Sequence, residues 1–265
     1  MKGRIIPIIQ ALITIALLTW IFRDARVRTE AATIWGIVDL RWVALGLIAG
    51  GINEVAGALR WWCCMHLAGV PVGIKRAAAL HFMGLFATLF LPGSAGGDAV
   101  KMAWVAVEFP ERRIGGVLAA LMDRLSGLVA IMMTAVVIAM TRREWFESAP
   151  VAAALFRGVM IFFAVASAGL IFWGITSRPR FREMHPKWLP MRERIIEIAS
   201  IFDAFFSDKR RALGSIGLSF VALGSFFFIY YCAGRAVGVT VPFFDLFSIM
   251  PVIDVVTMLP VTLSG

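Results

Sequence analysis

The sequence contains few of the residues that soluble enzymes depend on. Only 16% of its 265 residues are charged, whereas about 25% is usual in soluble domains. Its cysteines, Cys63, Cys64 and Cys232, are odd in number and lack the spacing of a disulfide framework or of metal ligands. The three histidines show no paired spacing either. We therefore predict no metal site.

Motifs for enzymatic chemistry are also missing. The sequence has no nucleotide-binding loop, no Ser/His/Asp order in a suitable context and no Asp-x-Asp pair for a metal-bound sugar nucleotide. It has no soluble domain large enough to house such chemistry. We expect neither a catalytic function nor a cofactor. A membrane-embedded transferase that uses Asp98 or Asp123 with a lipid-linked donor is the weakest of the alternatives.

Apolar residues, by contrast, make up 60% of the chain. Five windows are long enough to cross a bilayer, because a helix needs about 20 mostly apolar residues to span about 30 Å of hydrocarbon. The first resembles a signal peptide, but bulky Trp20 and Phe22 stand where small cleavage-site residues would be needed, so we expect an uncleaved helix. The predicted fold class is all-α, a polytopic transmembrane helical bundle. The windows are residues 5–22, 42–59, 114–140, 158–175 and 212–233.

Basic residues flank these windows and give the chain a net charge of +9. Such flanking is typical of membrane topology and lipid contact, so nucleic acid is not an expected partner. Nine basic residues fall in residues 178–211, which the positive-inside rule places in the cytoplasm. An apolar face in this segment predicts a short amphipathic helix, either on the inner leaflet or packed on the bundle. This topology puts residues 23–41 outside, the N-terminus in the cytoplasm and the protein in the inner (cytoplasmic) membrane.

Two further apolar stretches, residues 77–91 and 243–263, are interrupted by residues that disturb helices. Proline removes a backbone donor, and glycine permits conformations that other residues avoid. Irregular backbone at membrane depth is tolerated only inside protein or beside a wet cavity. We therefore predict two broken or re-entrant helices. Their expected hinge and turn residues are Pro92, Gly93, Gly96, Gly97, Pro251 and Pro260.

The two interrupted stretches resemble each other. A Gly-Val-x-Val run begins at Gly69 before the first and at Gly238 before the second, and a Leu-Pro pair follows each, with the proline 23 and 22 residues after the glycine. Three spanning helices separate the copies, so the copies face opposite sides of the membrane. This pattern predicts an inverted repeat with a site near the midplane, the alternative being coincidence.

The expected organisation is a single transmembrane domain over residues 1–265. Its predicted parts are a first helix with an outer loop (1–40), repeat one (41–140), a linking helix with the basic segment (141–211) and repeat two (212–265).

Ionisable residues lie inside the apolar windows, where a charge needs a partner or a cavity. Asp123 lies about 14 Å along its helix, close to mid-bilayer. Asp123 and Arg124 are expected to form either a functional site or a structural ion pair. Glu54 shares a glycine-rich face, which close helix packing alone would explain. Glu54 is expected to be the partner of Arg124 or a proton carrier.

Three more ionisable residues belong to the interrupted stretches. Asp98 closes the glycine-rich turn, where it serves either as a helix N-cap or beside backbone amides that hold a lipid phosphate. Lys101 follows three residues later. Asp254 stands between two prolines, and we expect it to be buried and functional.

Residues 91–101 (Leu-Pro-Gly-Ser-Ala-Gly-Gly-Asp-Ala-Val-Lys) and 123–128 (Asp-Arg-Leu-Ser-Gly-Leu) together resemble the lysylphosphatidylglycerol synthase transmembrane-region family, also described as flippase-like membrane proteins. That family typically shows Pro-Gly-x-x-Gly-Gly-Asp-x-x-Arg and then Asp-Arg-x-x-Gly. Arg60-Trp61-Trp62 fits its loop after the second helix. Lys101 stands where arginine is usual, which keeps the charge but loses bidentate phosphate recognition. The chain ends inside the family's last motif, so we expect one or more helices to be missing.

The resemblance implies a protein that translocates or handles lipids. In multidomain relatives this region moves the product of an aminoacyl-lipid synthase domain between leaflets. We expect this chain to move or handle a phospholipid or glycolipid headgroup, with membrane lipids as partners. The alternative is a non-transporting accessory subunit of a lipid-modifying enzyme. The residues expected to line a central polar cavity and bind the substrate are Glu54, Asp98, Lys101, Asp123, Arg124 and Asp254.

Overall fold

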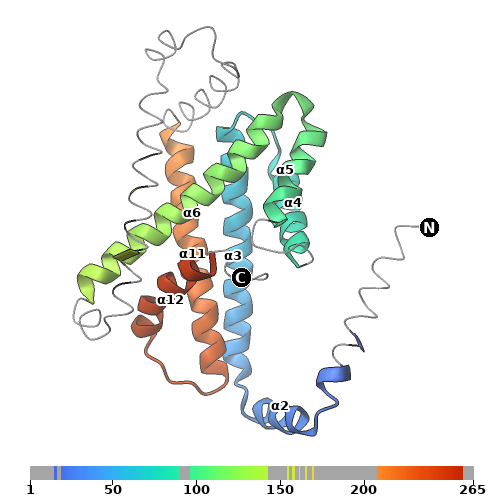
Figure 1. Ribbon diagram of the computed structural model, residues 1–265, viewed down its shortest axis with the longest axis vertical. Coiled ribbons are helices and arrows are strands. Elements are labelled where there is room, and N and C mark those ends of the chain that lie inside the picture. Colours follow the sequence, from blue (N-terminus) through green and yellow to red (C-terminus); the bar gives the residue numbers. More distant parts are fainter. Residues whose placement is uncertain are drawn as a thin grey trace.

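Helices are the only regular secondary structure among the residues that the computed structural model describes. These residues are 15–16, 19–89, 96–142, 154, 157–158, 161, 165, 169 and 208–258. The architecture is the predicted all-α membrane bundle (Figure 1). The elements are α2 (Ala25–Ile37), α3 (Leu40–Leu67), α4 (Ile74–Thr88), α5 (Gly96–Glu108), η1 (Pro110–Arg112), α6 (Arg113–Thr141), α11 (Lys209–Ala236) and α12 (Phe243–Met258).

Three helical segments are long and apolar enough to cross a membrane: Leu40–Leu67, Pro110–Ile138 and Lys209–Ala236. They confirm the windows predicted at residues 42–59, 114–140 and 212–233. The helix α3 continues well beyond the window at residues 42–59. Arg60-Trp61-Trp62 therefore lies inside α3, whereas a loop was predicted there. The predicted window ended just before Arg60, whereas the helix continues because Arg60 finds partners inside the protein. The windows at 5–22 and 158–175 fall largely outside the described residues.

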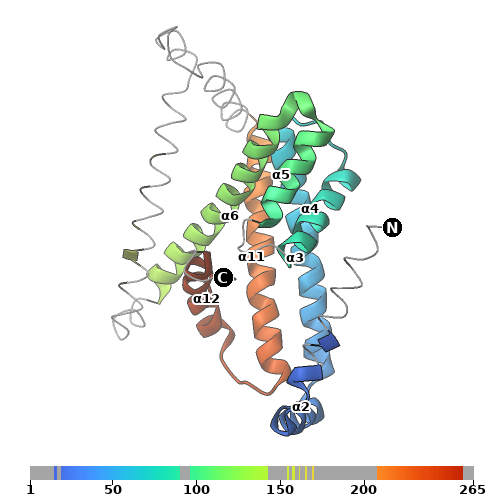
Figure 2. The same cartoon turned by 45° about the vertical axis from the view of Figure 1, so that its right-hand side comes forward.

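The helices α3 and α11 run antiparallel through the centre of the bundle, side by side (Figures 1 and 2). The backbone N–H of Asp39, at the start of α3, donates to the carbonyl of Ala236, at the end of α11, over 3.0 Å. The long helix α6 crosses both at a steep angle and packs on each of them. This crossing leaves room between the three helices, and the candidate site lies there.

The turns after α3 and α11 have the same construction. Gly69 and Gly238 have φ values of 73° and 83°, in the left-handed region that favours glycine. In each turn the next residue, Val70 or Val239, donates its backbone N–H to a carbonyl in the last turn of the helix. These bonds satisfy carbonyls that a helix end leaves without partners. The inverted repeat that this likeness suggested in the sequence stays a prediction.

The helices α4 and α5 form a hairpin in which both outer ends lie on the same side (Figure 2). The Arg76 guanidinium, near the start of α4, pairs with the Glu108 carboxylate at the end of α5 over 2.6 Å. Two glycines let the helices approach closely, because a Cβ atom at Gly97 would lie only 2.5 Å from the carbonyl oxygen of Gly84. Gly96 and Gly97 were predicted turn residues and begin α5, whereas Pro92 and Gly93 lie outside the described residues. The re-entrant depth of this hairpin stays a prediction.

The second interrupted stretch differs from its prediction. The helix α12 runs without a break through Pro251 to Met258, although a break was expected at Pro251. Pro251 is fully buried, and α12 packs on α6 and α11, so tertiary contacts offset the one backbone hydrogen bond that proline removes. Pro260 lies outside the described residues.

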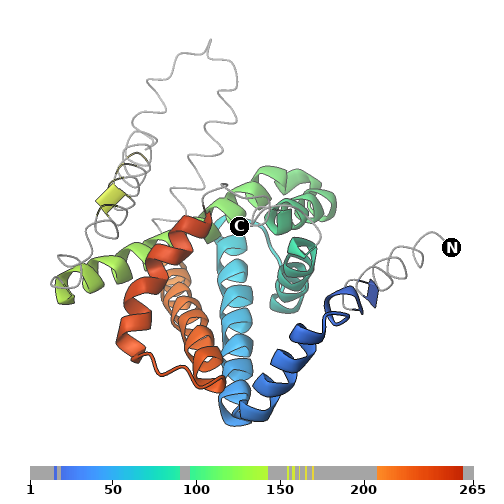
Figure 3. The ribbon, with the colours of Figure 1, turned by 60° about the horizontal axis from the view of Figure 1, so that its bottom comes forward.

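The segment of residues 23–41, which was predicted to lie outside the membrane, includes a helix. Residues 25–37 form the helix α2, which leads away from the bundle (Figure 3). Its Trp35 side chain is 80% exposed. The outer position of this segment was inferred by counting membrane crossings and stays a prediction, and a helix whose charged side chains face water is compatible with it. The predicted amphipathic helix of the basic segment falls on residues outside the described part of the chain.

The apolar core has two parts. The first joins α3, α4, α5 and α6 around Trp61, Met65 and Leu80. The second joins α6, α11 and α12 around Phe227 and Met250. The candidate site adjoins both clusters: Ile131 and Leu223 of the second line it, and its Lys101 lies 4.5 Å from the ring of Trp61 in the first.

Candidate functional site

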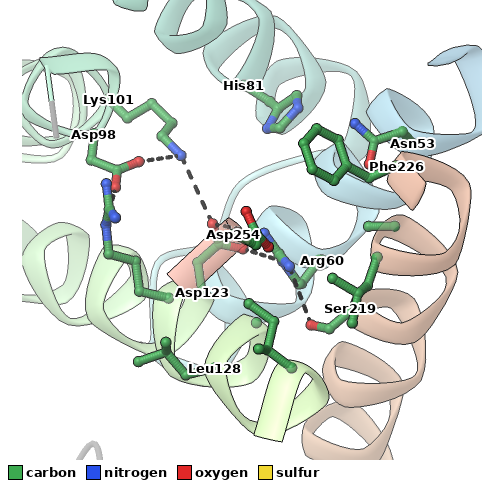
Figure 4. Close-up of a pocket in the computed structure, with 15 residues that line it drawn as sticks. Asn53, Arg60, His81, Asp98, Lys101, Asp123, Leu128, Ser219, Phe226 and Asp254 are labelled. Carbon is green, nitrogen blue, oxygen red and sulfur yellow. Dashed lines mark hydrogen bonds and ion pairs between the residues drawn. The ribbon is translucent and has the colours of Figure 1, made fainter. Parts of the chain in front are cut away.

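A cavity of about 420 Å³ adjoins both parts of the core. Side chains from α3, α4, α5, α6, α11 and α12 line it (Figure 4). Its charged residues come from four helices that are separated in the sequence, α3, α5, α6 and α12. The polar residues that line it are Asn53, Arg60, His81, Asp98, Lys101, Asp123, Arg124, Ser219 and Asp254.

Asp123, on α6, lies at the centre of the cavity wall. Its side chain is only 10% exposed. The Arg60 Nε atom donates to Asp123 Oδ1 over 2.7 Å, and Lys101 Nζ lies 3.9 Å from Asp123 Oδ2. A buried carboxylate is tolerated only when charges and hydrogen bonds compensate it. Asp123 meets that condition through cations from two other helices.

Lys101 and Asp98 form the second part of the network, both from the first two turns of α5. The Lys101 Nζ atom lies 2.7 Å from Asp98 Oδ1 and 4.5 Å from the centre of the Trp61 ring. The ring face attracts the ammonium group, which has left water almost entirely because Lys101 is only 7% exposed. Lys101 thus connects Asp98 with Asp123.

Arg124 completes the sequence of ion pairs. Its Nε atom donates to Asp98 Oδ2 over 2.6 Å, while its side chain remains 41% exposed. Contacts run from Arg124 through Asp98, Lys101 and Asp123 to Arg60 (Figure 4). Asp98 lies in the first turn of α5 and there accepts side-chain donors.

The expected pair of Glu54 with Arg124 is wrong. Glu54 Oε2 lies 3.1 Å from His81 Nε2, and Asn53 Nδ2 donates to Glu54 Oε1 over 3.0 Å. The helix α4 packs on α3 here, and Gly57 leaves room for the imidazole, because a Cβ atom there would lie 2.8 Å from His81 Cε1. Sequence spacing gave no information on which helix faces Glu54.

The cavity brings together five of the six residues that the sequence predicted for substrate binding. Asp98, Lys101, Asp123, Arg124 and Asp254 line it, and Glu54 touches it through His81. Their role in binding stays a prediction.

Four polar residues of the cavity, Asn53, Arg60, His81 and Ser219, were not predicted as site residues. Arg60 follows Asn53 and Gly57 at helical spacing, a signal that could have placed it on the same face. His81 interrupts an apolar run, which is a comparable signal. Ser219 Oγ accepts from the Arg60 guanidinium over 3.2 Å, and no pattern in the sequence distinguishes this serine from its neighbours.

The charges of the cavity balance. Arg60, Lys101 and Arg124 supply three cations, and Asp98, Asp123 and Asp254 supply three carboxylates. Such a lining offers donors to an anionic group and acceptors to a cationic one. Among the described residues, no group of three His, Cys, Asp or Glu side chains is placed to hold a metal ion. The arrangement is suited to a polar group that carries charge of either sign.

Comparisons with known proteins give a family. Residues 8–265 match the protein family described as the lysylphosphatidylglycerol synthase TM region. No curated protein and no solved structure matches the chain. The match covers the helices that carry every residue of the cavity.

Proposed function

Because the chain belongs to the lysylphosphatidylglycerol synthase TM region family, whose members are membrane proteins tied to lipid handling, we propose that it moves a lipid headgroup between leaflets. The headgroup of a phospholipid or glycolipid binds in the cavity between α3, α5, α6 and α11. The observation that carries this proposal is the convergence of three cations and three carboxylates in one cavity among membrane-crossing helices. The proposed location is the inner membrane, with the N-terminus in the cytoplasm.

The cavity lowers the main barrier to leaflet transfer. A charged headgroup cannot enter hydrocarbon without losing its water, which costs many kcal/mol unless protein groups replace that water. The three cations are already paired with carboxylates, and two of them, Arg60 and Lys101, are also largely shielded from water before any lipid arrives. A lipid phosphate takes Arg124 from Asp98, which keeps Lys101 as its partner, so no carboxylate is left without a cation.

Arg124 is the cation best placed to meet a phosphate first. Its side chain is 41% exposed, against 19% for Arg60 and 8% for Lys101. A guanidinium offers a planar set of donors that fits phosphate oxygens in pairs. Lys101 then supplies charge deeper in the cavity, and the carboxylates balance an amine or face a sugar hydroxyl. The proposal includes no catalytic step and no cofactor.

The test is leaflet transfer by purified protein in liposomes. A fluorescent phosphatidylglycerol or phosphatidylethanolamine is placed in both leaflets, and a membrane-impermeant quencher reports how fast the inner pool reaches the outside. Arg124→Ala is expected to slow transfer by about tenfold or more, since hydrogen bonds to a charged group contribute roughly 1.5–3 kcal/mol.

Arg142→Ala is a matched control. Arg142 follows the same helix, is also 41% exposed and also pairs with an aspartate, Asp245, but it does not line the cavity. The control should transfer lipid at the wild-type rate. Equal rates for wild type and Arg124→Ala would remove the site from the proposal.

The rival function is that of an accessory subunit of a lipid-modifying enzyme. It predicts no transfer by the purified wild-type chain, together with co-purification of an aminoacyl- or glycosyl-transferase. That pair of results would replace the transport proposal.

A further inference from the structure

A second cavity, of about 720 Å³, lies beside the charged one. Residues of α3 and α11 form its walls, and Phe82 of α4 closes one side. Its lining is apolar except at one end, and several of its side chains are exposed, including Leu47 at 73% and Phe82 at 48%. We call this cavity the apolar groove. It is defined by Trp42, Leu47, Gly51, Val55, Phe82 and Ile229.

A thin polar wall separates the apolar groove from the charged cavity. Asn53 lines both, Glu54 lines the groove and His81 lines the charged cavity. These three residues are joined to one another, by Asn53 Nδ2 to Glu54 Oε1 at 3.0 Å and by the Glu54–His81 contact at 3.1 Å. We call them the polar wall. Within the described residues, the Nδ1 atom of His81 is buried without a hydrogen-bond partner.

We propose that the apolar groove holds a hydrocarbon chain of the same lipid whose headgroup occupies the charged cavity. This inference rests on the proposed function. A membrane lipid has a charged end, then hydrogen-bonding ester or amide groups, then apolar chains. The protein presents the same three environments in the same order: the charged cavity, the polar wall and the apolar groove.

The polar wall suits the linkage region of a lipid. The Asn53 amide carries a second N–H and an oxygen, and a neutral His81 that donates Nε2–H to Glu54 leaves Nδ1 as an acceptor. These groups can meet an ester carbonyl or a free hydroxyl. One ligand that crosses the wall would therefore find partners in all three environments.

The groove orients the chain and adds little driving force. A hydrocarbon chain in a bilayer is already away from water, so entering the groove gains only van der Waals packing. The orientation matters because a headgroup can enter the cavity only if its chains leave in a direction that the helices permit. Here that direction lies between α3 and α11, toward Phe82.

Gly51 provides a way to fill the groove without disturbing the protein. A Cβ atom at Gly51 would find no atom within 4 Å, although the residue lines the groove. A leucine at position 51 therefore projects into the space that the chain would occupy. Gly217, on the spanning helix α11, has the same open surroundings and lines neither cavity, so Gly217→Leu is the matched control.

The experiment uses the full chain in lipid nanodiscs that contain phosphatidylglycerol with a photoactivatable diazirine in one acyl chain. After irradiation, mass spectrometry measures the labelling of residues 42–55 relative to the rest of the protein. We expect Gly51→Leu to reduce this labelling by about tenfold, because the added side chain occupies part of the groove that the hydrocarbon chain would fill, and Gly217→Leu to leave it unchanged. Thermal unfolding of each variant shows whether it folds, and Gly51→Ala is a milder second variant that should give an intermediate loss.

Lys101→Gln distinguishes a chain of the bound lipid from ordinary surrounding lipid. If headgroup and chain belong to one molecule, removing a cation from the charged cavity lowers labelling of the groove. Labelling that is strong but independent of Lys101 would mean surrounding lipid only, and it would overturn the inference.

Leaflet transfer separates this inference from the proposed function. Wild-type transfer together with unchanged transfer and labelling in Gly51→Leu would reject the groove and leave the function intact. No transfer by wild type would reject the function, while labelling that depends on both Gly51 and Lys101 would still establish the bipartite lipid site.

Discussion

The segments that begin with α3 and with α11 have the same framework but carry different chemistry. Each helix is 28 residues long and begins after an aspartate whose carboxylate accepts a backbone N–H in the first turn, Asp39 in one and Asp208 in the other. Each ends in a glycine turn with positive φ. Their interiors diverge, because α3 carries Asn53, Glu54 and Arg60 where the cavity-facing residues of α11 are Ser219 and apolar side chains.

This difference shows which segment supplies the charges of the cavity. Helix ends and turns are governed by backbone hydrogen bonds, which every segment must satisfy in the same way. The cavity is governed by charge, and the segment from α3 to α5 supplies both Arg60 and Lys101. The segment from α11 to α12 supplies a hydroxyl, one carboxylate and an apolar wall. Substitutions in the two segments should therefore have very unequal effects.

The largest difference is expected between Arg60→Met and Ser219→Ala. Arg60→Met leaves Asp123 without its closest cation in a buried position, and breaking such a pair costs about 3 kcal/mol of unfolding free energy. Ser219→Ala removes one acceptor from Arg60, which keeps Asp123, so the loss is about 1 kcal/mol. Reversible unfolding in mixed micelles measures both. Equal losses of unfolding free energy would show that the Arg60–Asp123 ion pair contributes no more to stability than the Ser219 hydroxyl does.

A smaller difference is expected between the two glycine turns. Alanine at Gly69 or Gly238 must adopt a left-handed conformation, which costs roughly 1–2 kcal/mol. At Gly69 the added Cβ atom also lies 3.3 Å from an Arg112 guanidinium nitrogen, whereas at Gly238 nothing lies within 4 Å. The melting temperature of Gly69→Ala should be slightly lower than that of Gly238→Ala. The reverse order would mean that the second turn bears the greater constraint.

The smallest effect concerns the cap of α11 and depends on pH. The pKa of Asp208 lies below its usual value, chiefly because the Arg211 backbone N–H donates to the carboxylate, with help from the Arg211 guanidinium at 2.7 Å. A depressed pKa stabilises the fold above the unfolded-state pKa of about 4, and the gain is lost as pH falls through the lower folded-state pKa. Between about pH 5 and pH 3 the melting temperature of wild type should fall more than that of Asp208→Asn. Parallel curves would exclude this contribution.

Much of the fold follows from the sequence because a bilayer imposes simple rules on length and polarity. The spanning windows at residues 114–140 and 212–233 agree with α6 and α11 within a few residues, and positive φ at Gly69 and Gly238 accompanies the likeness of the two turns. The extent of α3 was missed because the predicted window ended before Arg60, whose charge is compensated by partners on α6 and α11 that the sequence does not reveal.

The candidate site was less accessible to sequence reasoning. The ionisable residues stood out inside apolar segments, since burial of an unpaired charge is costly. Their partners depend on how helices cross, and a sequence does not state that His81 of α4 contacts Glu54 of α3. The continuous helix through Pro251 was missed for the same reason, because packing by other helices decides whether a proline breaks a helix.

An experimental structure of the chain in nanodiscs that contain phosphatidylglycerol would test most directly whether a lipid headgroup binds in the charged cavity. We expect phosphate density inside the charged cavity, within hydrogen-bonding distance of Arg124 or Lys101. We also expect density for a hydrocarbon chain that leads past Asn53 into the apolar groove. Lipid density confined to the outer surface of the helices, with the Arg124–Asp98 and Lys101–Asp98 pairs intact and only water between them, would contradict both expectations.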